Sequence, residues 1–188
     1  MADTSVRPGR LIDVSAFVDV QRHAWRSLPT DLWAVPDVDT LDADAMLRSW
    51  ERAVLLPPTS RHRLLIALEG ETVVGGAALT PADDPDLPDG VVAAESDQER
   101  ADELALLVVD PDHRRRGHGS RLMAAAADLV RTGGVPTLVT WVPASDDDAR
   151  AWLVGAGWAA DGAHRTVELD GRIVRELRFA TDVRPDPA

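Results

Sequence analysis

The residues best suited to chemistry lie in one loop, which follows an apolar strand and precedes an alanine-rich helix. The loop spans residues 110–120 and reads Asp-Pro-Asp-His-Arg-Arg-Arg-Gly-His-Gly-Ser. Gly117 and Gly119 carry no Cβ, so the backbone here can approach a ligand closely. The first N–H groups of the following helix lack intrahelical partners and favour an anion. Guanidinium groups match phosphate oxygens. We therefore predict a phosphate-binding loop, with one or two of its arginines turned to water.

Two common nucleotide-binding patterns are excluded. The chain has no lysine, so it cannot contain the P-loop sequence G-x-x-x-x-G-K-[ST], and the loop lacks the three glycines of the dinucleotide fingerprint. The pattern that remains is Arg114-x-x-Gly117-x-Gly119 directly after a strand that ends in Val-Asp-Pro. A glycine-rich turn with solvated arginines is the alternative interpretation.

Composition excludes several classes of function. The chain has 32 acidic and 20 basic residues and a formal net charge of −12, which opposes nucleic-acid binding. An acidic surface can concentrate cationic ligands; the alternative interpretation is solubility, a salt-adapted proteome or a GC-rich coding bias. It contains no cysteine, so disulfides, thiolate zinc sites and a cysteinyl acyl-enzyme are excluded. The five histidines have no spacing typical of metal ligands, and we expect no metal.

Length and hydropathy indicate one domain over residues 1–188, with a frayed tail at 182–188. No apolar run approaches the roughly 18 residues of a membrane span, and the first residues do not resemble a signal peptide. We expect a cytoplasmic protein without a membrane partner.

The hydrophobic pattern predicts alternating strands and helices without internal repeats. Strands are expected at about 5–8, 63–68, 72–80, 104–109, 137–142, 164–169 and 173–179, and helices at about 13–28, 42–55, 122–130 and 145–155. Asp13 is expected to cap the first helix, and Ser145 with Asp148 to form a capping box for the last. Residues 81–102, rich in proline and acidic side chains, are expected to form a loop.

This order of elements, together with the loop, resembles the GCN5-related N-acetyltransferase (GNAT) family over nearly the whole chain. The family's loop pattern is Q/R-x-x-G-x-G/A, and a second signature is matched by Asp146, Ala149, Trp152, Leu153 and Gly157-Trp158. Two positions depart from it: Asp146 stands where the family often has asparagine, and Leu153 where it has tyrosine. The resemblance implies an α/β (α+β) fold with a mixed, mostly antiparallel central sheet, flanking helices and a splayed cleft for acetyl-CoA.

The resemblance also assigns cofactor contacts along the central strand. The backbone N–H of Leu107 would polarise the thioester carbonyl, and Val109, with Val108, would pair with the pantetheine amides. The pyrophosphate would be held by the loop residues Arg114, Arg115, Arg116, Gly117, His118, Gly119 and Ser120. His118 is expected to face solvent or the adenosine phosphate. Asp146 would lie beside the cofactor.

An amine nucleophile must lose a proton, so a base is needed near the same strand. Glu103, four residues before Leu107, is our candidate for this base. The alternative interpretation is that Glu103 faces solvent or binds the positive charge of the substrate. Asp102 points to the opposite face of a regular strand and is the weaker candidate. Because the chain has no tyrosine, the leaving thiolate must be protonated by water, by the acceptor's ammonium or by a hydroxyl such as that of Ser145.

The acceptor is expected to be a small-molecule amine or a peptide amine. Trp25, Trp33 and Trp141 are our candidates for its binding residues, with burial in the core as the alternative for each. The resemblance also allows a homodimer. The competing functional hypothesis is a non-catalytic acyl-CoA-binding or regulatory domain with the same fold.

Overall fold

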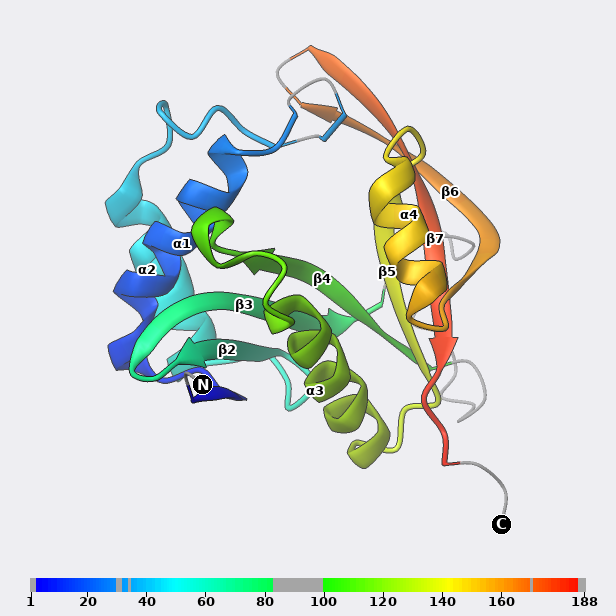
Figure 1. Cartoon of the computed structure of the whole chain (residues 1–188), viewed down its shortest axis with the longest axis horizontal. Helices are drawn as coiled ribbons and strands as arrows, with labels where there is room; N and C mark the ends of the chain where they lie inside the picture. Colours follow the sequence, from blue (N-terminus) through cyan, green and yellow to red (C-terminus); the bar gives the residue numbers. More distant parts are fainter. Residues whose placement is uncertain (1–2, 30–31, 34, 83–99, 170, 186–188) are drawn as a thin grey trace.

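The computed structural model describes residues 3–29, 32–33, 35–82, 100–169 and 171–185. Figure 1 shows the element order, which alternates strands and helices as the hydrophobic pattern predicts. The strands are β1 (Thr4–Pro8), β2 (Arg63–Glu69), β3 (Thr72–Pro81), β4 (Ala101–Val109), β5 (Thr137–Pro143), β6 (Ala159–Leu169) and β7 (Arg172–Asp182). The helices are α1 (Val14–Arg26), α2 (Ala43–Leu55), α3 (His118–Thr132) and α4 (Asp147–Gly155), with single 3₁₀ turns at Leu11–Asp13 and Pro111–His113.

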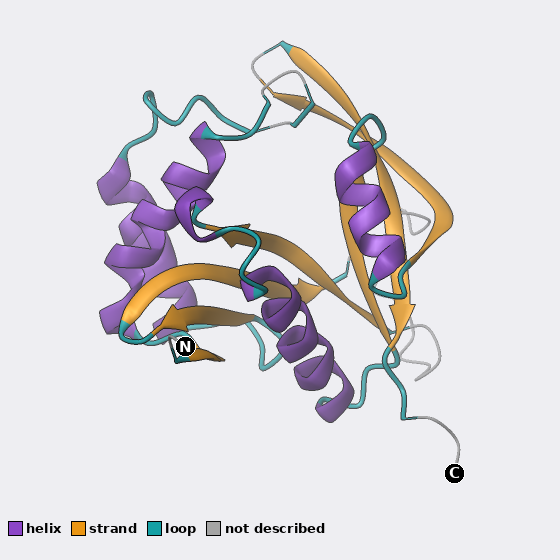
Figure 2. Cartoon of the chain, in the orientation of Figure 1, coloured by secondary structure: helices purple, strands orange, loops and turns teal. Residues whose placement is uncertain are grey.

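All seven strands form one sheet in the order β1-β2-β3-β4-β5-β7-β6. Every neighbouring pair is antiparallel except β4 and β5, which run parallel. The predicted α/β class with a mixed, mostly antiparallel sheet is therefore confirmed. Figure 2 shows the helices packed against this sheet.

The helices cover opposite faces of the sheet. Phe17 and Ala24 of α1, with Trp50 of α2, pack against Leu64, Ile66, Leu68 and Val108 on one face. Leu122, Met123, Ala126 and Val130 of α3, with Leu153 of α4, pack against the other face. Each strand between them contributes alternate side chains to the two faces, as a strand buried on both sides must.

Gly76 sets how closely α1 approaches β3. A Cβ at this position would lie 2.4 Å from Cε2 of Phe17, closer than van der Waals contact permits. The Phe17 ring, which is fully buried, occupies that space and meets Trp50 edge-on, with ring centroids 5.0 Å apart. This contact fixes α1, and with it the start of the connection to α2.

Two irregularities place the functional end of β4. Leu79 pairs with Leu104 and Ala78 with Leu106, so Ala105 is an extra residue and forms a bulge. The bulge exchanges the faces on which later side chains lie: Leu104 packs with α3, whereas Leu106 and Val108 pack with α1. Pairing between β4 and β5 covers only Ala101–Glu103 against Thr137–Val139, after which the two strands diverge.

Several boundaries differ from expectation. Pro81 belongs to β3, and Ala101 and Asp102 belong to β4, so the expected loop at 81–102 is shorter at both ends; its residues 83–99 lie outside the described residues. β6 begins at Ala159 and shifts register before His164. The expected frayed tail is wrong at its start, because Asp182 ends β7 and Val183 is buried, its N–H donating to the carbonyl of Pro136 at 2.9 Å.

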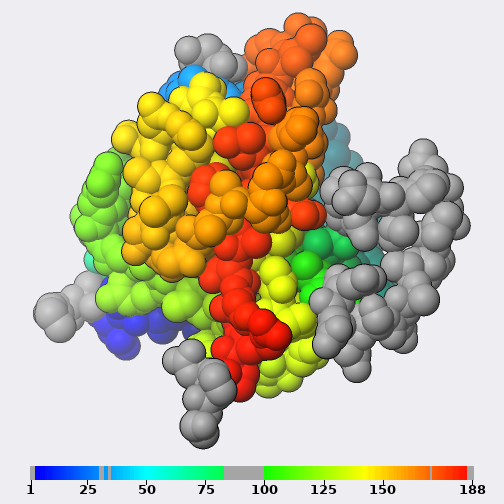
Figure 3. Space-filling view, turned by 90° about the vertical axis from the view of Figure 1, so that its right-hand side faces the viewer, coloured from blue at the N-terminus to red at the C-terminus, as the bar shows by residue number. Residues whose placement is uncertain are grey.

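Figure 3 shows the side of the molecule formed by α4, β7 and β6. β6 is the outer strand of the sheet, and most of its residues are exposed. None of the described helices is long and apolar enough to cross a membrane.

Candidate functional site

The predicted phosphate-binding loop leads directly into the start of α3. Gly117 precedes the helix with φ 83°, a left-handed conformation that glycine adopts without a Cβ penalty. No side chain caps the helix there. The N–H groups of the first turn and the positive end of the helix dipole are thus available to an anion. Arg115, with φ 62°, is the one residue other than glycine with positive φ in the described part of the chain.

The three arginines of the loop diverge. Nη2 of Arg114 donates to Oγ of Ser27 at 2.6 Å, and Nη1 of Arg116 lies 3.2 Å from both carboxylate oxygens of Glu69. Arg115 is exposed. Two of the three guanidinium groups therefore contact neighbouring elements, while all three arginines are exposed.

His118, the first residue of α3, is not solvent-facing. Its side chain is 1% exposed, and Nε2 lies 3.4 Å from Oε2 of Glu69. The expectation that it faces solvent or the adenosine phosphate is wrong, because the first turn of α3 packs this ring against Glu69 at the end of β2.

After Glu103, β4 and β5 diverge, and the edge of β4 that faces β5 lies beside α3. The hydroxyl of Thr140 donates to the carbonyl of Leu104 at 2.9 Å and replaces one missing backbone bond between the strands. Beyond it, Leu107 and Val109 pack on the α3 side of the sheet, whereas Val108 is buried on the α1 side. Beyond Glu103, the backbone groups of β4 that point away from β3 have no partner strand among the described residues.

Glu103 and Asp102 stand at the last paired positions before the divergence. Glu103 is half-buried and pairs in register with Thr80 and Val139. Asp102 is buried, and burial raises the pKa of its carboxyl, although Nε of Arg61, 2.6 Å away, opposes that rise. Asp102 is therefore already engaged by a cation, while Glu103 lies on the opposite face of the strand.

Asp146, rather than Ser145, caps α4. Its Oδ1 accepts the N–H of Ala149 at 2.9 Å, and its Oδ2 accepts the indole N–H of Trp33 at 2.7 Å. The expected Ser145–Asp148 capping box is therefore replaced by this single carboxylate, because the helix starts one residue later than expected. Ser145 is exposed in the turn after β5, and Leu153, in the tyrosine position, is buried.

The candidate acceptor residues do not share one surface. Trp25 lines a cavity of about 460 Å³ together with Val35, Pro36, Val38 and the charged residues Arg26, Asp37, Asp39 and Arg172. Trp33 instead binds Asp146 and packs at the edge of the core. Trp141 carries the guanidinium of Arg165 over its ring at 4.5 Å, with that of Arg178 at 5.7 Å.

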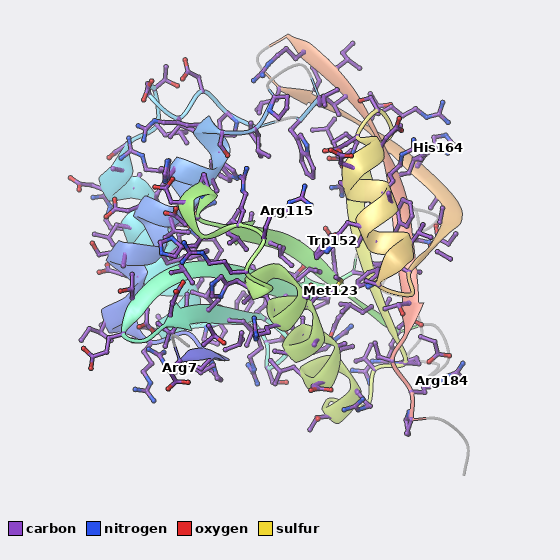
Figure 4. All side chains as sticks on the ribbon, viewed as in Figure 1. Arg7, Arg115, Met123, Trp152, His164 and Arg184 are labelled. Atoms are coloured by element: carbon purple, nitrogen blue, oxygen red, sulfur yellow. The ribbon has the colours of Figure 1, made fainter. Side chains whose placement is uncertain are left out.

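Trp152, a position of the second family signature, is 40% exposed. A Cβ built on Gly119 would lie 3.6 Å from its Cζ2 and 3.8 Å from Cδ2 of Leu107. Trp152 of α4, the start of α3 and β4 thus meet at one point. Figure 4 shows Trp152 and Arg115 on facing sides of the region between α3 and α4. Its place in the second signature was visible in the sequence, but no sequence signal indicated this exposure.

One further group escaped sequence reasoning. Ligand-type atoms of His23, Asp110 and Asp112 lie within 4.8 Å of one another, and Nδ1 of His23 is 3.3 Å from Oδ2 of Asp110. Residues from α1 and from the loop meet here, a proximity that their separation in the chain conceals. The contact links α1 to the start of the phosphate-binding loop.

Comparisons with known proteins agree with this geometry. Residues 19–158 match the family model described as the acetyltransferase (GNAT) family. YncA of Salmonella typhimurium, whose structure contains acetyl-CoA as its cofactor, is 20% identical, with a TM-score of 0.67 over 98% of this chain and 96% of that one. The ribosomal-protein-alanine N-acetyltransferase of Brucella melitensis is 18% identical, with a TM-score of 0.71 over 95% and 99%.

The PaiA N-acetyltransferase of Thermoplasma acidophilum, in complex with coenzyme A, is 12% identical, with a TM-score of 0.64 over 96% of this chain and 99% of that one. No curated protein sequence matches the chain. At these identities, the structural likenesses establish the shared fold.

Proposed function

Because the chain belongs to the acetyltransferase (GNAT) family, we propose that it is a single catalytic domain that transfers acetyl from acetyl-CoA directly to an amine in a ternary complex. The observation that carries this proposal is the uncapped start of α3 beside the diverging inner edge of β4. The start of α3 suits the pyrophosphate of coenzyme A, because free N–H groups at a helix start bind anions. The unpaired edge of β4 suits the amide groups of the pantetheine chain.

The residues present fit coenzyme A. The N–H groups of the first turn of α3, with Gly117 in its left-handed conformation, suit the pyrophosphate, and exposed Arg115 can add a charged contact. The unpaired backbone groups of Leu107 and Val109 suit the pantetheine amides. Val108 turns its side chain into the core and pairs its backbone with Gly76 of β3, so we assign it no contact with the pantetheine. Both carboxylate oxygens of Asp146 already accept hydrogen bonds, from the indole N–H of Trp33 and the backbone N–H of Ala149. We therefore assign Asp146 a role in shaping the cofactor site.

Acetyl-CoA, when bound, supplies a thioester whose carbonyl carbon is the electrophile. The N–H of Leu107 would stabilise the negative charge that develops on the carbonyl oxygen, since a fixed donor does so without reorganising. Glu103 would accept the proton of the attacking amine, directly or through water. Ser145 is one possible source of the proton for the departing sulfur; the acceptor's ammonium and water are the others.

The acceptor is proposed to be a small cationic amine or a peptide amine that approaches from the connection between α1 and α2. The cavity beside Trp25 supports an approach of the acceptor from this side, because Asp37 and Asp39 in its lining can attract a cation. The formal net charge of −12 also favours a cation. If steering contributes, kcat/KM falls as salt rises, whereas a neutral or anionic acceptor gives little or the opposite dependence.

The deciding experiment mixes the purified protein with acetyl-CoA and a panel of amines and peptides while free thiol release is followed. Release that depends on one class of amine, with the acetylated product identified by mass, supports the proposal. Coenzyme A binding without turnover across the panel supports the alternative, a non-catalytic acyl-CoA-binding domain. Absence of coenzyme A binding would refute both.

A further inference from the structure

We propose that Glu69, the last residue of β2, is a positioning residue for the phosphate-binding loop and acts through Arg116 and His118. The inference rests on the proposed function, since the ligand whose affinity it sets is coenzyme A. Glu69 lies far from the loop in the chain and would not be selected by any motif of the loop itself.

Three basic side chains face the Glu69 carboxylate. Both of its oxygens lie 3.2 Å from Nη1 of Arg116, and Oε2 lies 3.4 Å from Nε2 of His118 and 3.9 Å from Nε2 of His113. The carboxylate is 19% exposed, whereas the His118 side chain is 1% exposed. One anion thus contacts the residue on each side of Gly117, the residue that precedes α3.

His118 adds an observation of its own. Its Nε2 is buried and makes no hydrogen bond among the described residues, although Glu69 is within reach. A buried polar atom without a partner is costly, so a small shift of the loop that completes this bond is favoured.

The backbone explains why the loop needs such a support. Arg115 is left-handed at φ 62° and Gly117 at φ 83°. The left-handed conformation is unfavourable for a residue with a Cβ, and it persists only where neighbouring contacts enforce it. Arg116, between the two, is held by Glu69 through its guanidinium and by Nη1 of Arg121, which donates to the Arg116 carbonyl at 3.0 Å. Without Glu69, one of these two supports is lost.

Charge and positioning make opposite predictions for a variant that lacks this carboxylate. If only electrostatics mattered, loss of the Glu69 charge would strengthen anion binding. A negative charge next to the phosphate site would be gone, and the Arg116 guanidinium would be free to bind the anion. If Glu69 positions the loop, its removal weakens binding, because the ligand must then order the loop and its side chains itself. The sign of the change in affinity separates the two.

The test is the coenzyme A dissociation constant of Glu69→Ala and Glu69→Gln, measured by calorimetry. We expect Glu69→Ala to weaken binding about tenfold, the scale of ordering one or two side chains. Glu69→Gln should fall between Glu69→Ala and the parent, because its amide oxygen can still accept from Arg116. KM for acetyl-CoA should rise with the dissociation constant, while kcat and the acceptor KM stay within about twofold of the parent.

Glu71→Gln is the matched control, since Glu71 is exposed in the turn that follows Glu69, and it should bind like the parent. Unchanged or tighter binding in both Glu69 variants would overturn the inference. If Glu69→Ala does not fold, Glu69→Gln decides alone, and affinity equal to that of the parent refutes the proposal. A parent protein that does not bind coenzyme A would instead refute the proposed function.

Discussion

Trp152 and Gly119 meet across the space between α4 and α3. A Cβ on Gly119 would lie 3.6 Å from Cζ2 of Trp152, which is ordinary van der Waals contact, and Gly119 has no positive φ. The fold therefore accepts a side chain here, although that side chain would project beside Leu107 and into the region assigned to coenzyme A. The position can be used to test binding separately from folding.

We predict that Gly119→Val abolishes measurable coenzyme A binding while the melting temperature stays within a few degrees of the parent. The added methyl groups would crowd the phosphates and the backbone donors of the helix start. Calorimetry with coenzyme A and a thermal scan check the two parts. Gly119→Ala, with one added methyl, is the graded control, and unchanged affinity in the valine variant would remove the loop from the cofactor site.

Glu103→Gln should lower kcat/KM by roughly 100-fold near neutral pH, the usual scale of general-base catalysis. The loss should shrink at alkaline pH, where the amine arrives already deprotonated. The pH–rate profile of the variant beside that of the parent measures both effects. Glu168→Gln, at an exposed position on β6, is the charge-matched control. A profile of unchanged shape would exclude Glu103 as the base.

Departure of the coenzyme A thiolate should depend little on a general acid. A thiol with a pKa near 8.5 leaves readily, so we expect Ser145→Ala to lose less than about tenfold in kcat. Leu153→Tyr should gain less than about tenfold. Because Leu153 is buried, the added ring and hydroxyl are also expected to lower stability by about 1–3 kcal/mol. A larger loss in the Ser145 variant, with its fold intact by circular dichroism, would identify that hydroxyl as the acid.

The ion pair between Asp13 and Arg7 should make the stability of the fold depend on pH. The guanidinium of Arg7, with its Nη1 2.6 Å from Oδ2, lowers the pKa of the Asp13 carboxyl, and the N–H of Arg10 adds to the effect. A lowered folded pKa means that the stabilisation is present above the unfolded value of about 3.9 and is lost as pH falls through the folded value. Asp13→Asn should therefore cost about 2 kcal/mol at pH 7 and less at pH 3, where protonation has begun to remove the stabilisation.

Urea unfolding of the parent and of Asp13→Asn at the two pH values measures this difference. Asp19→Asn, at an exposed position on α1, is the control and should change stability little at either pH. An equal loss at pH 3 and pH 7 would show that Asp13 contributes by shape and hydrogen bonding, without its charge.

His118 and Trp152 show where prediction from the sequence stops. Periodicity located the helices that carry them and most strand boundaries, because those depend on local spacing. It could not say which element lies opposite a given helix face. The polar ring of His118 meets Glu69 and is buried, whereas the apolar ring of Trp152 meets Gly119 and stays partly exposed.

Ala105 illustrates a second limit. The run Leu104-Ala-Leu-Leu-Val-Val is apolar throughout, so it has no alternation from which a bulge could be detected. The bulge decides that Leu107 and Val109 lie on the α3 side while Val108 does not. Asp146 is a similar case, because its second partner, Trp33, comes from a connection more than one hundred residues earlier.

The divergence of β4 and β5 gives the sheet two edges in its interior, in addition to the outer edges at β1 and β6. Unpaired strand edges can recruit other extended chains, which makes them sites of aggregation. Thr140 covers one carbonyl on β4, and any ligand that occupies the remaining length would shield both edges. Solution lifetime would then depend on ligand concentration: protein stored without coenzyme A should form aggregates sooner, and its β4 amides should exchange with deuterium faster, than protein stored with it.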